Sequence, residues 1–393
     1  MKPVQRIIVI VLDGVGAGEA PDAADYGDVG SNSLGNTARV LGGLDLPNMR
    51  DIGLGYVTPM LGVPPIPNPQ GAFGRLMPRS AGKDTISGHW ELMGVRLEKP
   101  LPTYPHGFPP EVIEEFTRRV GRDILGNKPA SGTEILKELG VEHIRSGKPI
   151  VYTSADSVFQ IAAHEEIIPI EQQYWMCLQA REMLQGEHGV GRVIARPFLG
   201  SAPENFTRTE RRRDYPLPPP TQTMIEKAVV AGLDVCSVGK IDDIFAHRGI
   251  TRSNHTTNNA TSLAALLEFL EADFKGVLFA NLIEFDMIYG HRNDAAGYAA
   301  ALKKVDDALP EIQQRLRAGD IAMFVADHGV DPTTPSTDHS REYAPLLVFG
   351  PPVRPGVHLG DRGSFSDVAA TIAQALDLEP PLVGQSFLEE ITA

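Results

Sequence analysis

Three short apolar runs, at residues 7–12, 277–283 and 321–326, are each followed by side chains that can bind a metal ion. In sequence order these side chains are Asp13, Asp286, His291, Asp327, His328 and His339. Ligands bind outside the carboxyl ends of the strands in open α/β sheets, so three such strands would bring these side chains together. A lone Asp-Gly is usually a turn and a lone histidine is usually a surface residue. The prediction therefore depends on the coincidence of the three ends.

Three carboxylates and three imidazoles at one sheet edge are the ligands expected of a metal centre. Carboxylates without compensating charge repel one another, which destabilises the site, and bound divalent cations remove this repulsion. A set of nitrogen and oxygen ligands without a thiolate suits two ions such as Mn²⁺, Zn²⁺ or Mg²⁺, and ligand type does not choose among them. Because a two-metal site stabilises both the attacking and the leaving oxygen, the pattern favours an in-line displacement.

The segment 81–91 places hydroxyl groups among glycines, ahead of an expected helix. Thr85 and Ser87 are both candidate N-caps of that helix. Beside two metal ions, such a hydroxyl is also a candidate nucleophile, and the N–H groups at the helix N-terminus would favour the phosphate that it carries. Gly82-Lys83 does not belong to a Walker loop, because Asp84 stands where a serine or threonine should follow the Gly-Lys pair.

Strand-like and helical segments alternate along the chain, which predicts α/β layers around a mostly parallel sheet. Besides the three runs above, 346–349 is a predicted strand, and the predicted helices are 260–270, 299–316 and 365–376.

Proline-rich stretches at 100–110 and 215–220 indicate hinges around an inserted domain at about 101–215. The core domain would then comprise 1–100 and 216–393, and the insert would contain the helices 111–120 and 171–184 and the strand 150–153. Alternatively, the two stretches are surface loops of a single domain.

Composition excludes several classes of function. The net charge of −14 over 393 residues argues against a nucleic-acid partner. Cys177 and Cys236 are the only cysteines, which argues against a disulfide framework and suits a reducing compartment. The apolar run at 7–12 is too short for a signal peptide, and no stretch reaches the roughly 18 apolar residues of a membrane span. A cytoplasmic protein without a membrane partner is expected.

Taken in order, Asp13-Gly14, the Gly-Lys-Asp-Thr segment ending at Thr85, Asp286 with His291, Asp327-His328 and His339 resemble the alkaline phosphatase superfamily. The closer resemblance is to the bacterial phosphopentomutase family, through the segments 82–94, 152–161, 192–198 and 338–346. It spans essentially the whole chain. It implies an alkaline-phosphatase-like α/β core with a central, mostly parallel sheet flanked by helices, and a smaller inserted α/β cap domain for substrate binding.

The resemblance also implies roles for individual residues. Asp286, His291 and His339 would hold one of two Mn²⁺ ions, and Asp13, Asp327 and His328 would hold the other. Thr85 would be the phosphorylated residue. Ser154 and Asp156 of the insert resemble ribose contacts. The candidates for binding the non-reacting phosphate are Arg192, Arg196, Arg208 and Lys240. Ile86-Ser87, Glu284, Val330 and His247 depart from the family pattern, and none of them is a proposed ligand.

The activity implied is interconversion of ribose 1-phosphate and ribose 5-phosphate, and of the 2-deoxyribose phosphates, in nucleoside catabolism. It would proceed through a phosphothreonine enzyme, primed by a sugar bisphosphate, and a 1,5-bisphosphate intermediate. The partners would be small-molecule pentose phosphates. Three alternatives remain: a simple metal-dependent phosphatase or sulfatase, a cofactor-independent phosphoglycerate mutase, and a non-catalytic metal-binding module.

Overall fold

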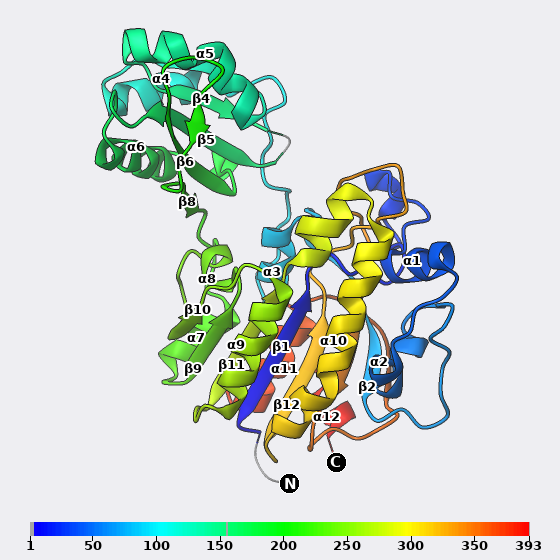
Figure 1. Cartoon of the computed structure of the whole chain (residues 1–393). Helices are drawn as coiled ribbons and strands as arrows, with labels where there is room; N and C mark the ends of the chain where they lie inside the picture. Colours follow the sequence, from blue (N-terminus) through cyan, green and yellow to red (C-terminus); the bar gives the residue numbers. More distant parts are fainter. Residues whose placement is uncertain (1–3, 155, 393) are drawn as a thin grey trace. The chain divides into compact units, whose positions relative to one another are not determined.

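The computed structural model describes residues 4–154 and 156–392, and the chain divides into two units (Figure 1). Unit 1 comprises Met1–Pro100 and Pro219–Ala393, and unit 2 comprises Leu101–Pro218. Each unit has its own sheet. Among the described residues, no helix is long and apolar enough to cross a membrane.

Unit 1 is built on an eight-stranded sheet. In spatial order its strands are β10 (Arg252–Asn254), β9 (Asp234–Val238), β11 (Gly276–Leu282), β1 (Arg6–Leu12), β12 (Asp320–Val325), β13 (Ala344–Phe349), β2 (Ala72–Leu76) and β14 (His358–Arg362). The first five run parallel to one another, whereas β13 runs antiparallel to both of its neighbours. The expectation of a mostly parallel sheet is confirmed.

The three apolar runs of the sequence form the central strands β11, β1 and β12. All three strands are buried along their length, which explains why they are continuously apolar rather than alternating. In the register, Leu12 pairs with Leu282 and Val11 pairs with Val325, so the carboxyl ends of the strands are level. The side chains that follow them therefore emerge at one edge of the sheet.

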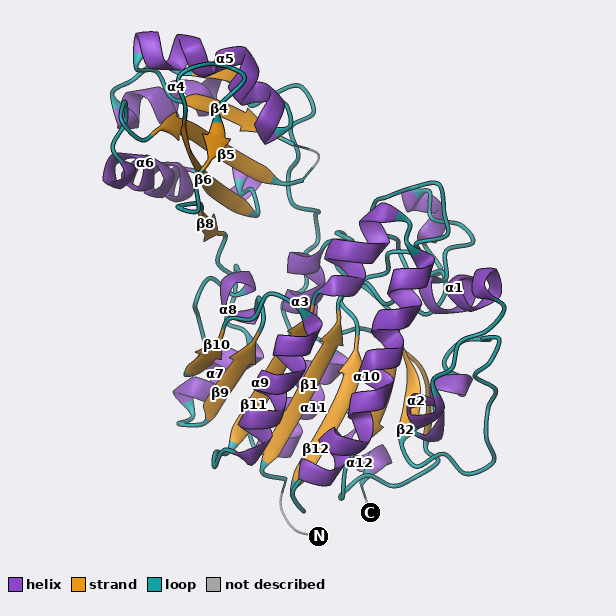
Figure 2. Ribbon diagram, in the orientation of Figure 1, coloured by secondary structure: helices purple, strands orange, loops and turns teal. Residues whose placement is uncertain are grey.

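Helices cover both faces of this sheet (Figure 2). One layer contains α1 (Ser33–Leu41), α2 (Pro47–Asp51), α9 (Asn259–Glu271) and α10 (Ala295–Arg315). The other contains α3 (Thr85–Leu92), α7 (Met224–Val230), α8 (Ile241–Ile244) and α11 (Asp367–Leu376), with α12 (Leu388–Ile391) against α11. The predicted helices 260–270, 299–316 and 365–376 are confirmed as α9, α10 and α11, although α10 begins four residues earlier than expected.

The amino ends of the central strands are joined by a buried ion pair. Arg6 is paired with Asp320 across β1 and β12, and its Nε atom donates to Asp320 Oδ1 at 3.0 Å. Both side chains are only 1% exposed. Removal of either partner would leave an unpaired buried charge. It would therefore lower the free energy of unfolding by about 3–5 kcal/mol. This pair fixes the register at the edge opposite to the metal ligands.

Unit 2 is a second, smaller α/β structure. Its sheet comprises, in order, β3 (Leu125–Pro129), β4 (Ile150–Thr153), β5 (Val158–His164), β6 (Arg192–Leu199) and β7 (Thr207–Arg208), and β8 (Arg213–Pro216) also pairs with β6. The helices α4 (Pro110–Val120) and α6 (Ile170–Met183) pack over a core that includes Phe116, Phe159 and Val193. On the other face, α5 (Gly132–Ser146) packs over a smaller cluster that includes Tyr152 and Phe198. The predicted helices 111–120 and 171–184 and the predicted strand 150–153 are confirmed.

Candidate metal centre and nucleophile

The predicted metal ligands lie on segments that directly follow the three central strands. Asp13 follows β1, and Asp327-His328 follow β12. After β11, a π-helical turn (Phe285–Tyr289) carries Asp286, and a 3-10 turn (Gly290–Arg292) carries His291. His339 lies on the segment between β12 and β13. A single π turn inside a chain is uncommon and is frequently found at functional sites.

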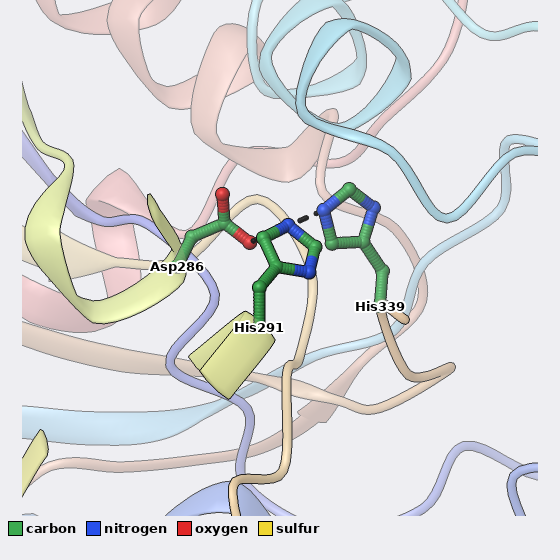
Figure 3. Close-up of side chains that lie close together, drawn as sticks. All are labelled: Asp286, His291 and His339. Carbon is green, nitrogen blue, oxygen red and sulfur yellow. Dashed lines mark ion pairs between the residues drawn. The ribbon is translucent and has the colours of Figure 1, made fainter. Parts of the chain in front are cut away.

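Asp286, His291 and His339 form the first group of ligand atoms (Figure 3). The Nε2 atoms of His291 and His339 are each 3.1 Å from Asp286 Oδ1. Figure 3 shows the two imidazole rings and the carboxylate converging on one point. This is the trio that the sequence analysis assigned to one metal ion.

The second group contains Asp13, Asp286 and His328. His328 Nε2 is 3.5 Å from Asp13 Oδ1. Asp327, the expected third member, lies beside this group with its Oδ2 atom 3.3 Å from His328 Nε2, and its Oδ1 atom accepts from Gly14 N at 3.1 Å. Asp286 thus belongs to both groups, which the sequence analysis did not anticipate.

Several of these ligand atoms are buried without a hydrogen-bond partner among the described residues. They are Asp13 Oδ1, Asp286 Oδ1, Asp327 Oδ2 and His339 Nε2. Because buried polar atoms are nearly always hydrogen-bonded, four such atoms in one place indicate a missing cationic partner. Burial, together with the charges of Asp327 and Asp286, also raises the pKa of Asp13 well above its ordinary value. The residues therefore fit divalent metal ions.

Outer contacts orient the ligands toward the same point. His328 Nδ1 lies 3.0 Å from Gly329 O and His291 Nδ1 contacts Thr337 O, which assigns the ring protons to Nδ1 and leaves Nε2 for a metal. Asn281 Nδ2 donates to Asp13 Oδ2 at 2.9 Å. Burial would raise the pKa of Asp286, but the adjacent imidazoles of His291 and His339 hold it well below its usual range.

Thr85 is the first residue of α3, and its Oγ1 atom lies 3.2 Å from His328 Nε2. The N-cap is Asp84, whose carboxylate accepts from Ile86 N and Ser87 N, so the expectation of a cap at Thr85 or Ser87 is wrong. The Ser87 hydroxyl is buried and donates to Asp84 Oδ2 at 2.8 Å. Thr85 is therefore the residue whose hydroxyl faces the metal ligands.

His89 is a site residue that the sequence analysis missed. Its buried Nδ1 atom is 2.8 Å from Thr85 O and 3.2 Å from Asp327 Oδ2. It therefore joins the helix that carries Thr85 to a carboxylate of the metal centre. The available signal was its spacing of four residues from Thr85, which places the two residues on one face of a helix.

The expected substrate residues are divided between the two units. Lys240, in unit 1, follows β9 and is exposed, and its Nζ atom is 3.5 Å from the sulfur of Met287, the neighbour of Asp286. In unit 2, Ser154 and Asp156 lie between β4 and β5, and Arg192 Nη2 is 3.9 Å from Asp156 Oδ2.

Arg196 and Arg208 belong to a basic cluster within unit 2. Arg196 donates from Nε to Gln160 Oε1 at 3.1 Å. Burial lowers the pKa of Arg196, and the neighbouring charges of Arg212 and Arg208 lower it further. Repulsion among guanidinium groups favours an anionic ligand, and in this cluster Arg212 is also paired with Asp214 at 2.7 Å.

The chain is similar to several known proteins. A family model described as the metalloenzyme superfamily matches residues 5–380. A curated phosphopentomutase from Herpetosiphon aurantiacus is 64% identical, with 99% of each chain covered. A phosphopentomutase from Caldanaerobacter subterraneus subsp. tengcongensis is 57% identical, with 98% of each chain covered. The solved phosphoglycerate mutase of Leishmania mexicana aligns over 98% of this chain and 97% of its own at 11% identity, with a TM-score of 0.49.

The α/β fold, the paired ligand groups and the family model define a metal-dependent phosphotransferase of the metalloenzyme superfamily. Within that superfamily, the identity to curated relatives over the full length decides the family. The chain belongs to the phosphopentomutases. The resemblance seen in the sequence is confirmed.

Proposed function

We propose that this protein interconverts ribose 1-phosphate and ribose 5-phosphate, and the corresponding 2-deoxyribose phosphates. The observation that carries the proposal is the position of the Thr85 hydroxyl, 3.2 Å from His328 Nε2 at the edge of two overlapping ligand groups. The names of the relatives at 57–64% identity support the choice of substrate.

The metal centre would hold two Mn²⁺ ions. Asp286, His291 and His339 would bind one ion, and Asp13 and His328, with Asp327 beside them and Asp286 shared, would bind the other. When bound, the two cations would lower the pKa of a neighbouring hydroxyl and balance the charge of a transferring phosphoryl group.

Thr85 would carry the phosphoryl group through the reaction. The bond between phosphorus and Thr85 Oγ1 breaks as the free hydroxyl of a pentose monophosphate bonds to that phosphorus, which gives a 1,5-bisphosphate. The bisphosphate then returns its other phosphoryl group to Thr85, so that the net reaction is isomerisation. A sugar bisphosphate would prime the enzyme. Ile86 N and Ser87 N already donate to Asp84, so the helix N-terminus offers the phosphate less than the sequence suggested.

Unit 2 would supply the sugar contacts and keep water from the phosphoenzyme. Ser154 and Asp156 would bind the ribose. The groups proposed to bind the non-reacting phosphate are Arg192, Arg196, Arg208 and Lys240. The clustering of Arg196 with Arg208 and Arg212 supports this role, because an anion relieves the repulsion among them. The enzyme would act in nucleoside catabolism in the cytoplasm.

The decisive experiment is to incubate the Mn²⁺-loaded, primed enzyme with ribose 5-phosphate and to measure ribose 1-phosphate and free phosphate separately. A mutase yields ribose 1-phosphate, whereas a phosphatase yields free phosphate. A parallel reaction with 3-phosphoglycerate tests the phosphoglycerate mutase alternative. No reaction in any of the three assays, with Mn²⁺ bound, would indicate a non-catalytic metal-binding module.

A further inference from the structure

Glu342 is a buried carboxylate that accepts four hydrogen bonds. Its Oε2 atom accepts from Gly18 N at 3.2 Å and from Ser33 N at 2.8 Å. Its Oε1 atom accepts from Ser33 Oγ and from Ser340 Oγ, each at 2.7 Å. The residue is 1% exposed. These four bonds satisfy both oxygens of the carboxylate, and two of the donors are rigid backbone N–H groups.

The groups around Glu342 belong to the segments that carry metal ligands. Gly18 lies on the loop that begins at Asp13, and Ser340 is the neighbour of His339. Ser340 is in turn joined to Gly329, the neighbour of His328, by two backbone hydrogen bonds of 2.7 and 3.1 Å. One side chain is therefore connected to three ligand-bearing segments.

Two glycines let these segments approach the carboxylate closely. A Cβ atom at Gly16 would overlap Oε2 of Glu342, and a Cβ atom at Gly329 would be 2.5 Å from Oε1. Contacts this short do not occur between real Cβ atoms and their neighbours. The loop after β1 and the loop after β12 are thus packed directly on the carboxylate.

We propose that Glu342 is a positioning residue for the metal centre, which fixes the loops of Asp13, His328 and His339 relative to one another without itself binding metal. The role rests on the metal centre of the proposed function. Outer residues that orient metal ligands typically contribute about 10–100-fold to metal affinity. Burial raises the pKa of Glu342 to about 7, as expected for a carboxyl group held by neutral donors rather than by a cation.

The chain offers two matched comparisons. In Glu342→Gln, the amide oxygen can accept from Gly18 N and Ser33 N, and the amide N–H groups can donate to the two serine hydroxyls, which rotate to suit. Glu342→Ala leaves all four groups without a partner. As a control, Asp306 is a buried carboxylate of α10 that accepts from Met49 N at 2.7 Å and from Asn48 Nδ2 at 3.0 Å, and neither partner lies next to a metal ligand.

The experiment measures Mn²⁺ affinity by electron paramagnetic resonance, and unfolding by urea, for the wild type and for Glu342→Ala, Glu342→Gln and Asp306→Ala. We expect Glu342→Ala to weaken Mn²⁺ binding about 10–100-fold and Glu342→Gln to restore most of it. Asp306→Ala should lower stability and leave Mn²⁺ affinity unchanged.

Unchanged affinity in Glu342→Ala, or equal weakening in Asp306→Ala, would overturn the positioning role. If Glu342→Ala does not fold, Ser340→Ala removes a single donor, and an affinity equal to that of the wild type would then overturn it. Failure of the wild type to bind two Mn²⁺ ions would instead overturn the metal centre itself.

Discussion

The Oγ1 atom of Thr85 lies 3.2 Å from the Nε2 atom of His328, although the two residues are 243 positions apart in the sequence. Asp84 caps α3 and accepts a hydrogen bond from the Ser87 hydroxyl, so the hydroxyl of Thr85 takes no part in capping the helix. The two hydroxyls that look equivalent in the sequence therefore have different tasks. One holds the helix end, and the other faces the metal ligands.

The first prediction is that the phosphoryl group resides on Thr85. After priming with a sugar bisphosphate, mass spectrometry should locate the phosphate on this residue, and Thr85→Ala should lose both the label and mutase activity. Ser87→Ala is the matched control. It should retain the label and lose stability, because loss of a helix-capping hydrogen bond costs about 0.5–2 kcal/mol. A phosphate on Ser87 would contradict the assignment.

The second prediction concerns the sharing of Asp286 between the two ligand groups. Because Asp286 belongs to both groups and His291 to one, Asp286→Ala should lose more metal than His291→Ala does. Elemental analysis after dialysis should find two metal ions per chain in the wild type, about one in His291→Ala and fewer in Asp286→Ala. Equal losses in the two variants would show that Asp286 serves a single ion.

The third prediction is that the stability of unit 2 depends on pH. His143 Nδ1 is 2.7 Å from Lys148 O, and its Nε2 atom accepts from His164 N at 2.8 Å, so Nε2 must stay unprotonated. Burial lowers the pKa of His143, and the charges of His164 and Arg122 act in the same direction. The unfolded chain therefore takes up the proton first, and stability is lost as the pH falls below about 6.5.

Hydrogen exchange in α5 and β5, followed at several pH values between 5 and 8, measures this effect. His143→Gln, which does not titrate, should flatten the dependence, whereas the same change at the exposed His106 should leave it as in the wild type. An unaltered pH dependence in His143→Gln would refute the prediction.

Particular residues show which parts of the fold and of the candidate site can be predicted from the sequence. The strands β1, β11 and β12 could be predicted because both of their faces are buried, which leaves continuous apolar runs with polar ends. The direction of β13 could not be predicted, because a short apolar run has the same pattern in either orientation. The order of the six proposed ligands likewise predicted side chains that the structure brings together, although Asp327 lies beside the second group rather than in it.

The finer arrangement of the site depends on contacts that sequence spacing does not encode. Asp286, which belongs to both ligand groups, lies on a π-helical turn, and such a turn has no simple sequence signature. His89 and Glu342 act through residues that are distant in the sequence, Asp327 and Gly18. The spacing of His89 from Thr85 indicates a shared helix face, but neither its contact with Asp327 nor that of Glu342 with Gly18 can be predicted from the sequence.

The last prediction separates a mutase from a phosphatase. Every proposed metal ligand lies in unit 1, whereas Ser154, Asp156 and the proposed phosphate-binding arginines lie in unit 2. Unit 1 retains its whole sheet and both helix layers without the insert. A protein in which Pro100 is joined to Pro219 through a short Gly/Ser linker should therefore bind the same metal ions as the full chain.

Such a protein should have lost mutase activity and should hydrolyse phosphate esters slowly, because sugar positioning and water exclusion are assigned to unit 2. Asp156→Ala in the full chain should show a milder form of the same change, with mutase flux falling more than release of free phosphate. Both rates are measured on ribose 5-phosphate. Mutase activity equal to that of the full chain, with the metal ions bound, would mean that unit 2 has a different role, because the chemistry would then need only the residues of unit 1.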